Sequence, residues 1–294
     1  METVPAKTIV AKTKCPEAWF GVDYNMNIYR GCSHGCIYCD SRSACYQNPD
    51  FGTVKVKENA LQIIRDELRR KTRRGVVATG AMSDPYNPLE QKLCLTRRAL
   101  ELLALYEFGV AIDTKSTLVT RDTDVLQEIG KKAPALVKVT ITTADAALGS
   151  RIEPHVASSA ERFSAIRILS NSGIFCGVLM MPILPFLNDT VENVGEIISR
   201  AKDAGAKFIY PAMGVTMREG NREYFYQKLD ERFPGVKQKY IDMYGMQYVC
   251  TSPNAKRLWE TFARQCEKAR LLYEMKDIIL AYKAEYSQQQ TSLF

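Results

Sequence analysis

Three cysteines near the N-terminus are the residues of this chain best suited to chemistry. The segment GCSHGCIYCD places Cys32, Cys36 and Cys39 in a C-x3-C-x2-C pattern. Thiolates at such short spacing can surround a soft metal centre, and cysteine ligands favour zinc, copper(I) or an iron–sulfur cluster. A four-iron cluster is normally held by four cysteines, so three ligands leave one iron open to another molecule. The pattern therefore indicates a metal centre with one open coordination position.

His34 offers a second interpretation of the same loop. It lies between Cys32 and Cys36 and could complete a Cys3His zinc site, because structural zinc takes four nitrogen or sulfur ligands. Its close sequence neighbours make such a site cramped, and the distant second C-x2-C pair usual in zinc sites is missing. For the six remaining cysteines we expect the role of small apolar fillers. These are Cys15, Cys45, Cys94, Cys176, Cys250 and Cys266.

The composition is that of a compact globular protein. Of 294 residues, 46% are hydrophobic and 25% are charged, which excludes a disordered, collagenous or coiled-coil chain. The first 15 residues contain no apolar signal core. The longest apolar run, residues 175–187, is shorter than the roughly 20 residues of a membrane span and contains two prolines. We expect a cytoplasmic protein with reduced cysteines and no membrane partner.

Short apolar segments alternate with helical patterns from about residue 26 to residue 211, which indicates βαβ units and a parallel sheet. The expected strands cover residues 27–29, 76–79, 110–114, 137–142, 175–181 and 207–210. The expected helices between them cover residues 58–73, 96–107, 122–131, 158–172 and 191–204. Glycines directly after these helical stretches are typical of left-handed helix caps.

Six strand–helix units are two fewer than a closed eight-stranded barrel needs. We therefore predict an α/β fold, a partial TIM-like (β/α)6 barrel of parallel strands over residues 26–211, with functional residues at the C-terminal strand ends. Residues 1–25 form an N-terminal extension. Residues 212–286 form a mostly helical C-terminal extension, with helices near 255–266 and 271–286, that caps the barrel or shapes the substrate mouth. Residues 287–294 form a flexible tail.

The position and spacing of the three cysteines resemble the radical S-adenosylmethionine (SAM) superfamily. Its defining loop follows the first strand of a partial barrel and has an aromatic residue before the last cysteine, here Tyr38. The resemblance implies a [4Fe–4S] cluster on Cys32, Cys36 and Cys39, with SAM bound at the open iron. It also implies reductive cleavage of SAM to a 5′-deoxyadenosyl radical, and a reductant such as flavodoxin or ferredoxin.

Further motifs resemble the spore photoproduct lyase branch of that superfamily. They are YRGCSHGCIYC, SDPYNPLE, TKSTLVTRD and ITT followed by RIEP, and the likeness covers most of residues 25–211. The resemblance implies a SAM site built from the cysteine loop and the next strand ends. Its residues would be Tyr38, Ser83, Asp84, Lys115, Thr140, Arg151 and Glu153.

Each of these residues also has an ordinary structural interpretation. The resemblance assigns Ser83 and Asp84 to the ammonium group of SAM, but Asp84 before a proline is also a common turn initiator. It assigns Lys115 to the SAM carboxylate or ribose, which suits a compact cation with three donors, although a lysine in a loop is often simply solvated. Arg151 and Glu153 would face the pocket, or form a surface ion pair.

One departure from the branch bears on the substrate. Spore photoproduct lyase carries a cysteine hydrogen donor at the end of the second strand, whereas residues 76–84 here read VVATGAMSD. We therefore expect a relative of the lyase with a different reaction. Nucleic acid is the first candidate substrate, and a peptide or small metabolite is the alternative. A non-catalytic zinc-containing adaptor that binds DNA or a sliding clamp is the alternative from another class.

Two features near the C-terminus could bind nucleic acid or a partner protein. Residues 218–248 interleave aromatic side chains with cations, which could stack on bases. Packing of these aromatics over the barrel is the interpretation that we favour, because large aromatic side chains mostly serve burial. The last residues, with Gln290, Leu293 and Phe294, resemble the tail by which bacterial proteins bind the sliding clamp. Such a peptide could dock two apolar anchors in a groove.

Overall fold

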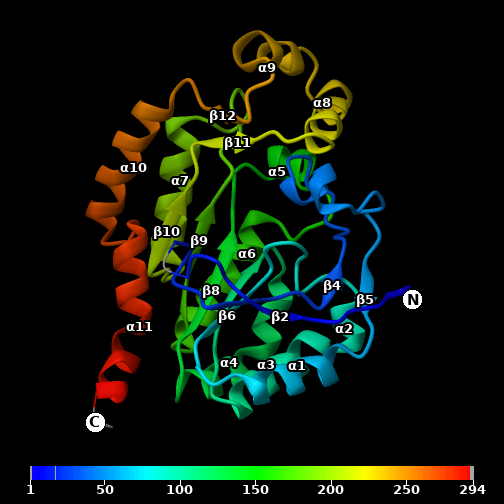
Figure 1. Cartoon of the computed structure of the whole chain (residues 1–294). Coiled ribbons are helices and arrows are strands. Elements are labelled where there is room, and N and C mark those ends of the chain that lie inside the picture. Colours follow the sequence, from blue (N-terminus) through cyan, green and yellow to red (C-terminus); the bar gives the residue numbers. More distant parts are fainter. Residues whose placement is uncertain (1, 17, 292–294) are drawn as a thin grey trace.

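The computed structural model describes residues 2–16 and 18–291, and its centre is a seven-stranded sheet (Figure 1). The strand order is β10-β9-β8-β7-β6-β3-β2, and every neighbouring pair is parallel except β2 with β3. The parallel strands are β3 (Tyr24–Met26), β6 (Val76–Thr79), β7 (Gly109–Thr114), β8 (Ala135–Thr140), β9 (Phe175–Met180) and β10 (Phe208–Pro211). β2 (Val10–Lys12) lies at one edge. These six parallel strands confirm the predicted partial barrel.

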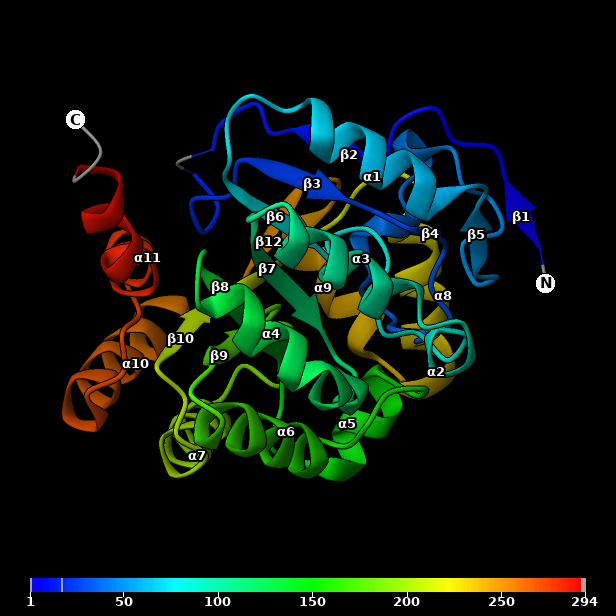
Figure 2. The same ribbon diagram turned by 90° about the horizontal axis from the view of Figure 1, so that it is seen from below.

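One helical layer covers the outer side of the sheet, as the view from below shows (Figure 2). Its helices are α1 (Ala60–Arg70), α3 (Leu95–Leu105), α4 (Thr123–Gly130), α6 (Ser159–Asn171) and α7 (Val191–Asp203). Side chains alternate along each strand. On β7, Val110 and Ile112 therefore belong to the core shared with the helices, whereas Ala111 belongs to the inner face. All five predicted helices are present within a few residues.

The inner face of the sheet is closed by the N-terminal segment and by the last helix. Phe20 and Tyr282 pack there with Leu179 and Phe208. Tyr282 lies on α11 (Met275–Thr291), which runs beside β10 in both views (Figures 1 and 2). Just before α11, Leu272 extends the sheet, because Ile209 N–H donates to its carbonyl oxygen at 2.9 Å. This contact covers the β10 edge that would otherwise be open.

The first predicted strand, residues 27–29, is wrong in position. The main sheet takes β3 (Tyr24–Met26), and the chain then leaves it for β4 (Tyr29–Arg30), which pairs with β5 (Lys55–Lys57) in a separate three-stranded sheet completed by β1 (Thr3–Val4). Tyr24, Met26 and Ile28 are all buried. The apolar alternation therefore continues past the point where strand pairing ends, and the pattern alone does not show that point.

The C-terminal region forms a small unit above the C-terminal strand ends, at the top of Figure 1. It contains β11 (Gly214–Thr216), β12 (Val249–Thr251), α8 (Asn221–Arg232) and α9 (Val236–Tyr244), followed by α10 (Ala255–Ala269), which packs on α7. Phe225, Tyr240 and Tyr244 are buried together, so the packing interpretation of the aromatic segment is confirmed for these residues. Tyr248 is 46% exposed.

Helix α11 extends to Thr291, so residues 287–291 of the predicted tail continue the helix. Leu293 and Phe294 of the predicted clamp-binding motif lie outside the described residues, and so does the side chain of Gln290. No helix within residues 2–16 and 18–291 combines the length and apolar composition that crossing a bilayer requires.

Candidate cofactor site

The three cysteines of the predicted metal site line one small cavity. They lie on the cysteine loop (residues 31–39), between β4 and a short 3-10 turn at Asp40–Arg42, in the blue segment below α8 in Figure 1. The cavity has a volume of about 90 Å³, and Cys32, Cys36 and Cys39 all contribute to its wall. All nine cysteines of the chain are free thiols. The structure therefore brings the three predicted ligands together.

Two glycines allow the backbone to approach closely around this cavity. Gly31 has a φ of 83°, and a Cβ there would lie 2.2 Å from the Thr53 carbonyl oxygen. Gly80, at the end of β6, has a φ of 108°, and a Cβ would lie 1.9 Å from the Asp113 carbonyl oxygen. Other residues cannot adopt these conformations without strain and collision. Both glycines thus position the cysteine loop and the strand end that faces it.

The ends of β6, β7 and β8 supply the remaining walls of the cavity. Ser83 and Asp84 follow β6, Lys115 follows β7, and Thr140 is the last residue of β8. These four residues were predicted to contact SAM, and the fold gathers them opposite the three thiols. In parallel-barrel enzymes the C-terminal strand ends carry the chemistry, so the location is that of an active site.

Asp84 ties neighbouring strand ends together. Its carboxylate accepts hydrogen bonds from Thr114 Oγ1 at 2.8 and 3.0 Å, from the Lys115 N–H at 2.7 Å and from the Tyr86 N–H at 2.9 Å. Ser83 donates its hydroxyl to the Gly31 carbonyl oxygen. Both side chains therefore have structural partners in addition to any ligand contact. A carboxylate has about four acceptor positions, so these bonds leave Asp84 little spare capacity.

His34 lies between Asp84 and the first cysteine. Its Nδ1 is 3.6 Å from Asp84 Oδ2, and it lines the same cavity as Cys32. Burial by itself lowers the pKa of His34, but the Asp84 carboxylate and Cys32 raise it above its ordinary value. Burial likewise raises the pKa of Cys32, but His34 outweighs this effect and the pKa is lowered. His34 thus favours the thiolate form of Cys32, which is the form that binds metals.

Cys36, which is buried, and Cys39, which like Cys32 is half-buried, face a cation instead. Burial raises the pKa of both thiols, and the positive charge of Lys115 opposes this rise. Burial lowers the pKa of Lys115, but the charges of Cys36, Glu153, Cys39 and Asp84 raise it above its ordinary value. Lys115 is therefore a stable cation beside the thiols, and its Nζ lies 5.7 Å from the centre of the Tyr38 ring.

A buried chain of polar contacts holds the cysteine loop from behind. Tyr38 donates its hydroxyl to Glu153, whose carboxylate pairs with Arg162 at 2.6 Å. Arg162 also donates to the Thr140 carbonyl oxygen at 2.7 Å. Burial raises the pKa of Glu153, but Arg162 and Lys115 hold it below its ordinary value. The chain links the loop to β8 and to helix α6.

Arg162 was not among the residues predicted from the sequence. The sequence does carry a signal that Arg162 is buried, because Arg162, Ile166 and Leu169 follow one another at helical spacing and share the buried face of α6. Arg162 is 2% exposed. A cation on the apolar face of a helix requires a buried partner, and here the partner is Glu153. The identity of that partner depends on the tertiary structure.

Arg151 was predicted to face the pocket, and the structure places it elsewhere. Its side chain is exposed. The guanidinium group donates to the Arg232 carbonyl oxygen and lies 4.1 Å from the centre of the Phe233 ring. Arg151 thus joins α5 (Ala146–Ile152) to the end of α8. The prediction that Arg151 faces the pocket is therefore wrong. Glu153 is buried beside the cysteine loop, whereas Arg151 is exposed on α5 and does not line the cysteine cavity.

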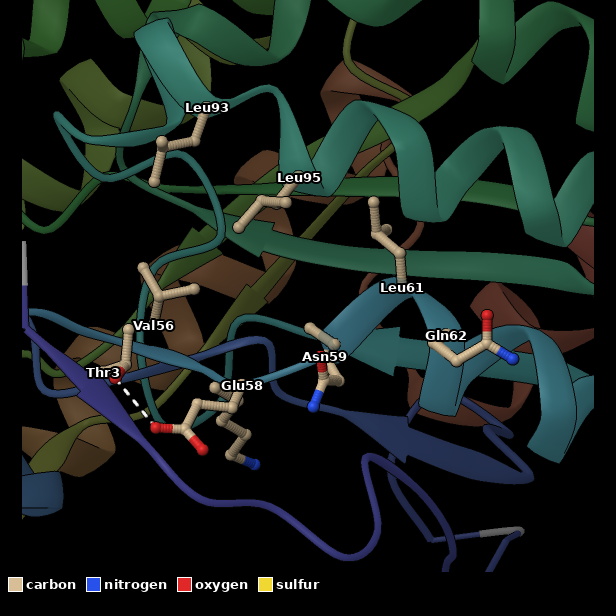
Figure 3. Close-up of a pocket in the computed structure, with 10 residues that line it drawn as sticks. Thr3, Val56, Glu58, Asn59, Leu61, Gln62, Leu93 and Leu95 are labelled. Atoms are coloured by element: carbon tan, nitrogen blue, oxygen red, sulfur yellow. Dashed lines mark hydrogen bonds between the residues drawn. The ribbon is translucent and has the colours of Figure 1, made fainter.

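One hollow larger than the cysteine cavity adjoins it, and another lies apart from it. One, of about 350 Å³, shares His34 and Lys115 with the cavity and is otherwise lined by residues 86–88, 116–118 and 155–157 and by Gln91. The other, of about 510 Å³, lies between β5 and the start of α1 and contains none of the predicted site residues (Figure 3). Its wall includes Leu61, Leu93 and Leu95.

The arrangement of the three thiols is compatible with ligands of a multinuclear cluster. Across the part of the chain that the structure describes, no group of three or more His, Cys, Asp or Glu side chains is placed to hold one metal ion. The three thiols nevertheless share one cavity wall. Ligands of a four-iron cluster each bind a different iron, so they need not converge on one point.

Comparison with known proteins assigns the family. The family model described as "Radical SAM superfamily" matches residues 26–201, which is more than half of the chain. The chain belongs to the radical SAM superfamily. Radical SAM proteins are enzymes that use a [4Fe–4S] cluster and SAM, so membership confirms both predicted cofactors and the enzyme class.

Relatives of this radical SAM enzyme occur in bacteria and archaea. An uncharacterized protein of Mycobacterium tuberculosis is 32% identical over 228 residues, which cover 75% of this chain and 67% of the relative. An uncharacterized protein of Methanocaldococcus jannaschii is 33% identical over 196 residues, covering 66% and 71%. These matches extend the family assignment and carry no statement of substrate.

Solved structures confirm the radical SAM fold. A spore photoproduct lyase variant with bound AdoMet and dinucleoside spore photoproduct aligns with a TM-score of 0.67 at 16% identity, covering 86% of this chain and 76% of that one. A radical SAM methyltransferase of Kitasatospora setae with tryptophan and a SAM analogue aligns with a TM-score of 0.54 at 11% identity, covering 83% and 51%. Both likenesses concern the fold alone.

Proposed function

We propose that this radical SAM enzyme holds its [4Fe–4S] cluster on Cys32, Cys36 and Cys39 and acts on nucleic acid. The observation that carries the first part is the shared cavity of the three thiols at the C-terminal strand ends, with the Lys115 cation beside them. When bound and reduced, the cluster would supply the electron for reductive cleavage of SAM, the chemistry by which the superfamily removes a hydrogen atom from a substrate.

The surrounding residues would bind and orient SAM. Lys115 would offer a half-buried cation to the SAM carboxylate, and a compact ammonium group suits that contact. The Ser83 hydroxyl oxygen would accept a hydrogen bond from the SAM ammonium group, and the Asp84 carboxylate would attract that group by its negative charge. Thr140 would contact the adenosyl part from the end of β8. Glu153, with Tyr38, would hold the cysteine loop rather than touch SAM.

The nucleic-acid part of the proposal has its own support. The fold aligns with spore photoproduct lyase bound to a dinucleoside photoproduct, and the chain carries a net charge of +7. Residues 76–84 contain no cysteine at the position of the lyase hydrogen donor, so we propose a reaction other than thymine-dimer repair. A peptide or small-molecule substrate is the competing outcome of the test below.

Anaerobic reconstitution tests the cofactor assignment. The wild-type protein should bind about four irons per chain and produce deoxyadenosine from SAM under dithionite, whereas Cys36→Ala should produce none. Stoichiometric zinc without iron would instead support the non-catalytic adaptor. Lys115→Ala should weaken SAM binding at least tenfold, with exposed Lys92→Ala as the matched control. An unchanged affinity in Lys115→Ala would remove Lys115 from the site.

Label transfer tests the substrate class. Deuterated single-stranded DNA, duplex DNA, RNA and a peptide mixture are each incubated with the reconstituted enzyme and SAM. Deuterium in deoxyadenosine from a nucleic acid supports the proposal, and label from the peptides alone would refute it. The experiment identifies the substrate class by hydrogen abstraction itself, so adventitious binding gives no signal.

Three partner and location assignments complete the proposal. An external one-electron reductant of the flavodoxin or ferredoxin class would serve the cluster, and a reducing compartment such as the cytoplasm would suit nine free thiols. A sliding clamp would bind Gln290, Leu293 and Phe294, on the strength of the motif alone. Deleting the last two residues should abolish clamp binding without changing SAM cleavage; unchanged clamp binding would dismiss this partner.

A further inference from the structure

A buried ion pair lies on the inner face of the sheet, among apolar side chains. Asp113 on β7 and Lys138 on β8 are register partners, and Lys138 Nζ lies 2.8 Å from Asp113 Oδ1. Lys138 is fully buried, and its Nζ lies 4.4 Å from the centre of the Phe20 ring. Ala111 and Leu136, two residues earlier on the same strands, are apolar members of this face. The proposed cluster and SAM contacts use neither charged residue.

One member of this pair reaches the cysteine cavity. Asp113 lines the cavity and its side chain is 13% exposed, whereas Lys138 does not line it and is 0% exposed. Within residues 2–16 and 18–291, Lys138 is the one side chain paired with Asp113, so Asp113 Oδ2 keeps its acceptor positions free. Stability alone does not explain the pair, because apolar residues of similar volume often stabilise a core equally well. Lys138 thus holds the carboxylate from behind and leaves one oxygen for a molecule in the cavity.

Asp113 lies deeper in the barrel than the proposed SAM contacts. Lys115 follows it by two residues, which is about 7 Å at the usual rise of a strand. Gly80 lies beside Asp113 at the end of β6, where a Cβ would lie 2.9 Å from the Asp113 Cβ. The missing side chain leaves space next to the carboxylate. A substrate must approach SAM from a side that neither the cysteine loop nor the SAM contacts occupy, and the deeper inner face provides one.

The charge balance of the pair indicates what Asp113 would bind. Because Lys138 already balances the negative charge, the pair presents an acceptor oxygen without a net charge, which favours a neutral N–H donor over a cation. Carboxylates accept hydrogen bonds from the exocyclic amino groups of nucleobases, as from N4 of cytosine. A base with a carbonyl group at that position would set one acceptor against another, and a buried acceptor left without a donor is unfavourable.

We propose that Asp113, held by Lys138, determines substrate specificity by accepting a hydrogen bond from the exocyclic amino group of the reacting nucleotide. The substrate nucleotide therefore carries cytosine, adenine or guanine, and not thymine or uracil. The inference rests on the proposed action on nucleic acid and narrows it to amino-bearing bases. The contact is a hydrogen bond alone, so no covalent bond to Asp113 forms or breaks.

Base substitution in the label-transfer assay tests this role. Oligonucleotides of the class that donates label are deuterated in one type of nucleotide at a time, and deuterium in deoxyadenosine identifies the nucleotide that reacts. Its base is then replaced by the counterpart without the amino group, which is uracil for cytosine and hypoxanthine for adenine or guanine. Wild type should prefer the amino-bearing base at least tenfold in kcat/KM, because the counterpart leaves Asp113 unpaired.

Variants of the pair show whether Asp113 is the source of that preference. Asp113→Asn can donate its amide to a carbonyl group, so the preference should fall at least tenfold, while the affinity for SAM stays within about twofold of wild type. A merely structural role would lower the rates with both bases equally. Asp203→Asn, exposed on α7, is the matched control and should keep the full preference. If Asp113→Asn does not fold, Asp113→Leu/Lys138→Met replaces it, with the same loss of preference expected.

The outcomes separate this inference from the proposed function. Label from no nucleic acid would refute the proposed function, and the inference with it. Label from thymine or uracil nucleotides alone would overturn the inference and leave action on nucleic acid standing, and so would equal reaction of the two matched bases in wild type. A variant of Asp113 that keeps the wild-type preference would also overturn it. If SAM affinity falls tenfold in that variant while the preference is unchanged, Asp113 contacts SAM instead.

Discussion

The ion pair of Glu153 and Arg162 offers the sharpest test of how the cysteine loop is held. Arg162→Met removes a guanidinium that lies 2.6 Å from the Glu153 carboxylate and 2.7 Å from the Thr140 carbonyl oxygen. Both charged side chains are almost completely buried. Removing one partner of a buried pair costs about 3–5 kcal/mol, because the other charge is left without compensation. With an m-value of about 3 kcal/mol per molar urea, the unfolding midpoint should fall by about 1–2 M.

The assay is urea unfolding of the reconstituted protein under anaerobic conditions, followed by circular dichroism. Arg167→Met on the exposed face of the same helix is the matched control and should change the free energy of unfolding by less than about 0.5 kcal/mol. The double variant Glu153→Gln/Arg162→Met removes the uncompensated charge and should regain at least half of the loss. If Arg162→Met unfolds like Arg167→Met, the pair does not stabilise the loop and the argument from burial is refuted.

Two further predictions concern other charged pairs. The Lys138 side chain is fully buried, and its Nζ lies 2.8 Å from an Asp113 carboxylate oxygen on the inner face of the sheet. Lys138→Met should lower the free energy of unfolding by about 3–5 kcal/mol, and the double variant Asp113→Leu/Lys138→Met should restore most of that loss. Equal urea midpoints for the single and the double variant would contradict the pairing. Arg97 lowers the pKa of Asp124 to about 2. The pair therefore stabilises the fold fully at pH values above the ordinary aspartate pKa of about 4, and this contribution is lost as the pH falls toward 2. The stability difference between wild type and Arg97→Gln should therefore shrink over that interval, and a constant difference would show that Asp124 is not the group concerned.

The strands and helices of the barrel were predictable because their signals are local. Each central strand is a short apolar segment and each helix ends near a glycine, as at Gly173, where φ is 78°. The first strand was displaced because burial continues to Ile28 after sheet pairing stops at Met26. Burial sets the apolar pattern, whereas hydrogen bonding sets the strand, and the two need not end at the same residue.

The site was predictable where one loop carries it and not where distant segments meet. The three cysteines share a single loop, so their proximity follows from their spacing. Arg151 and Glu153 are only two residues apart, yet Arg151 lies in the last turn of α5, whereas Glu153 follows the end of the helix with a non-helical φ of −135° and ψ of 71°. Glu153 is consequently inside and Arg151 outside. The contact of Glu153 with Arg162 depends on how α6 packs.

The central claim is that three thiolates leave one iron open to SAM. Its most direct test is electron–nuclear double resonance of the reduced wild-type protein with SAM labelled by 17O in the carboxylate and 15N in the amino group. Hyperfine coupling from both labels to the cluster is the predicted result, since only a bound, chelating SAM brings these atoms next to iron. A loaded cluster that binds SAM without either coupling would contradict the account.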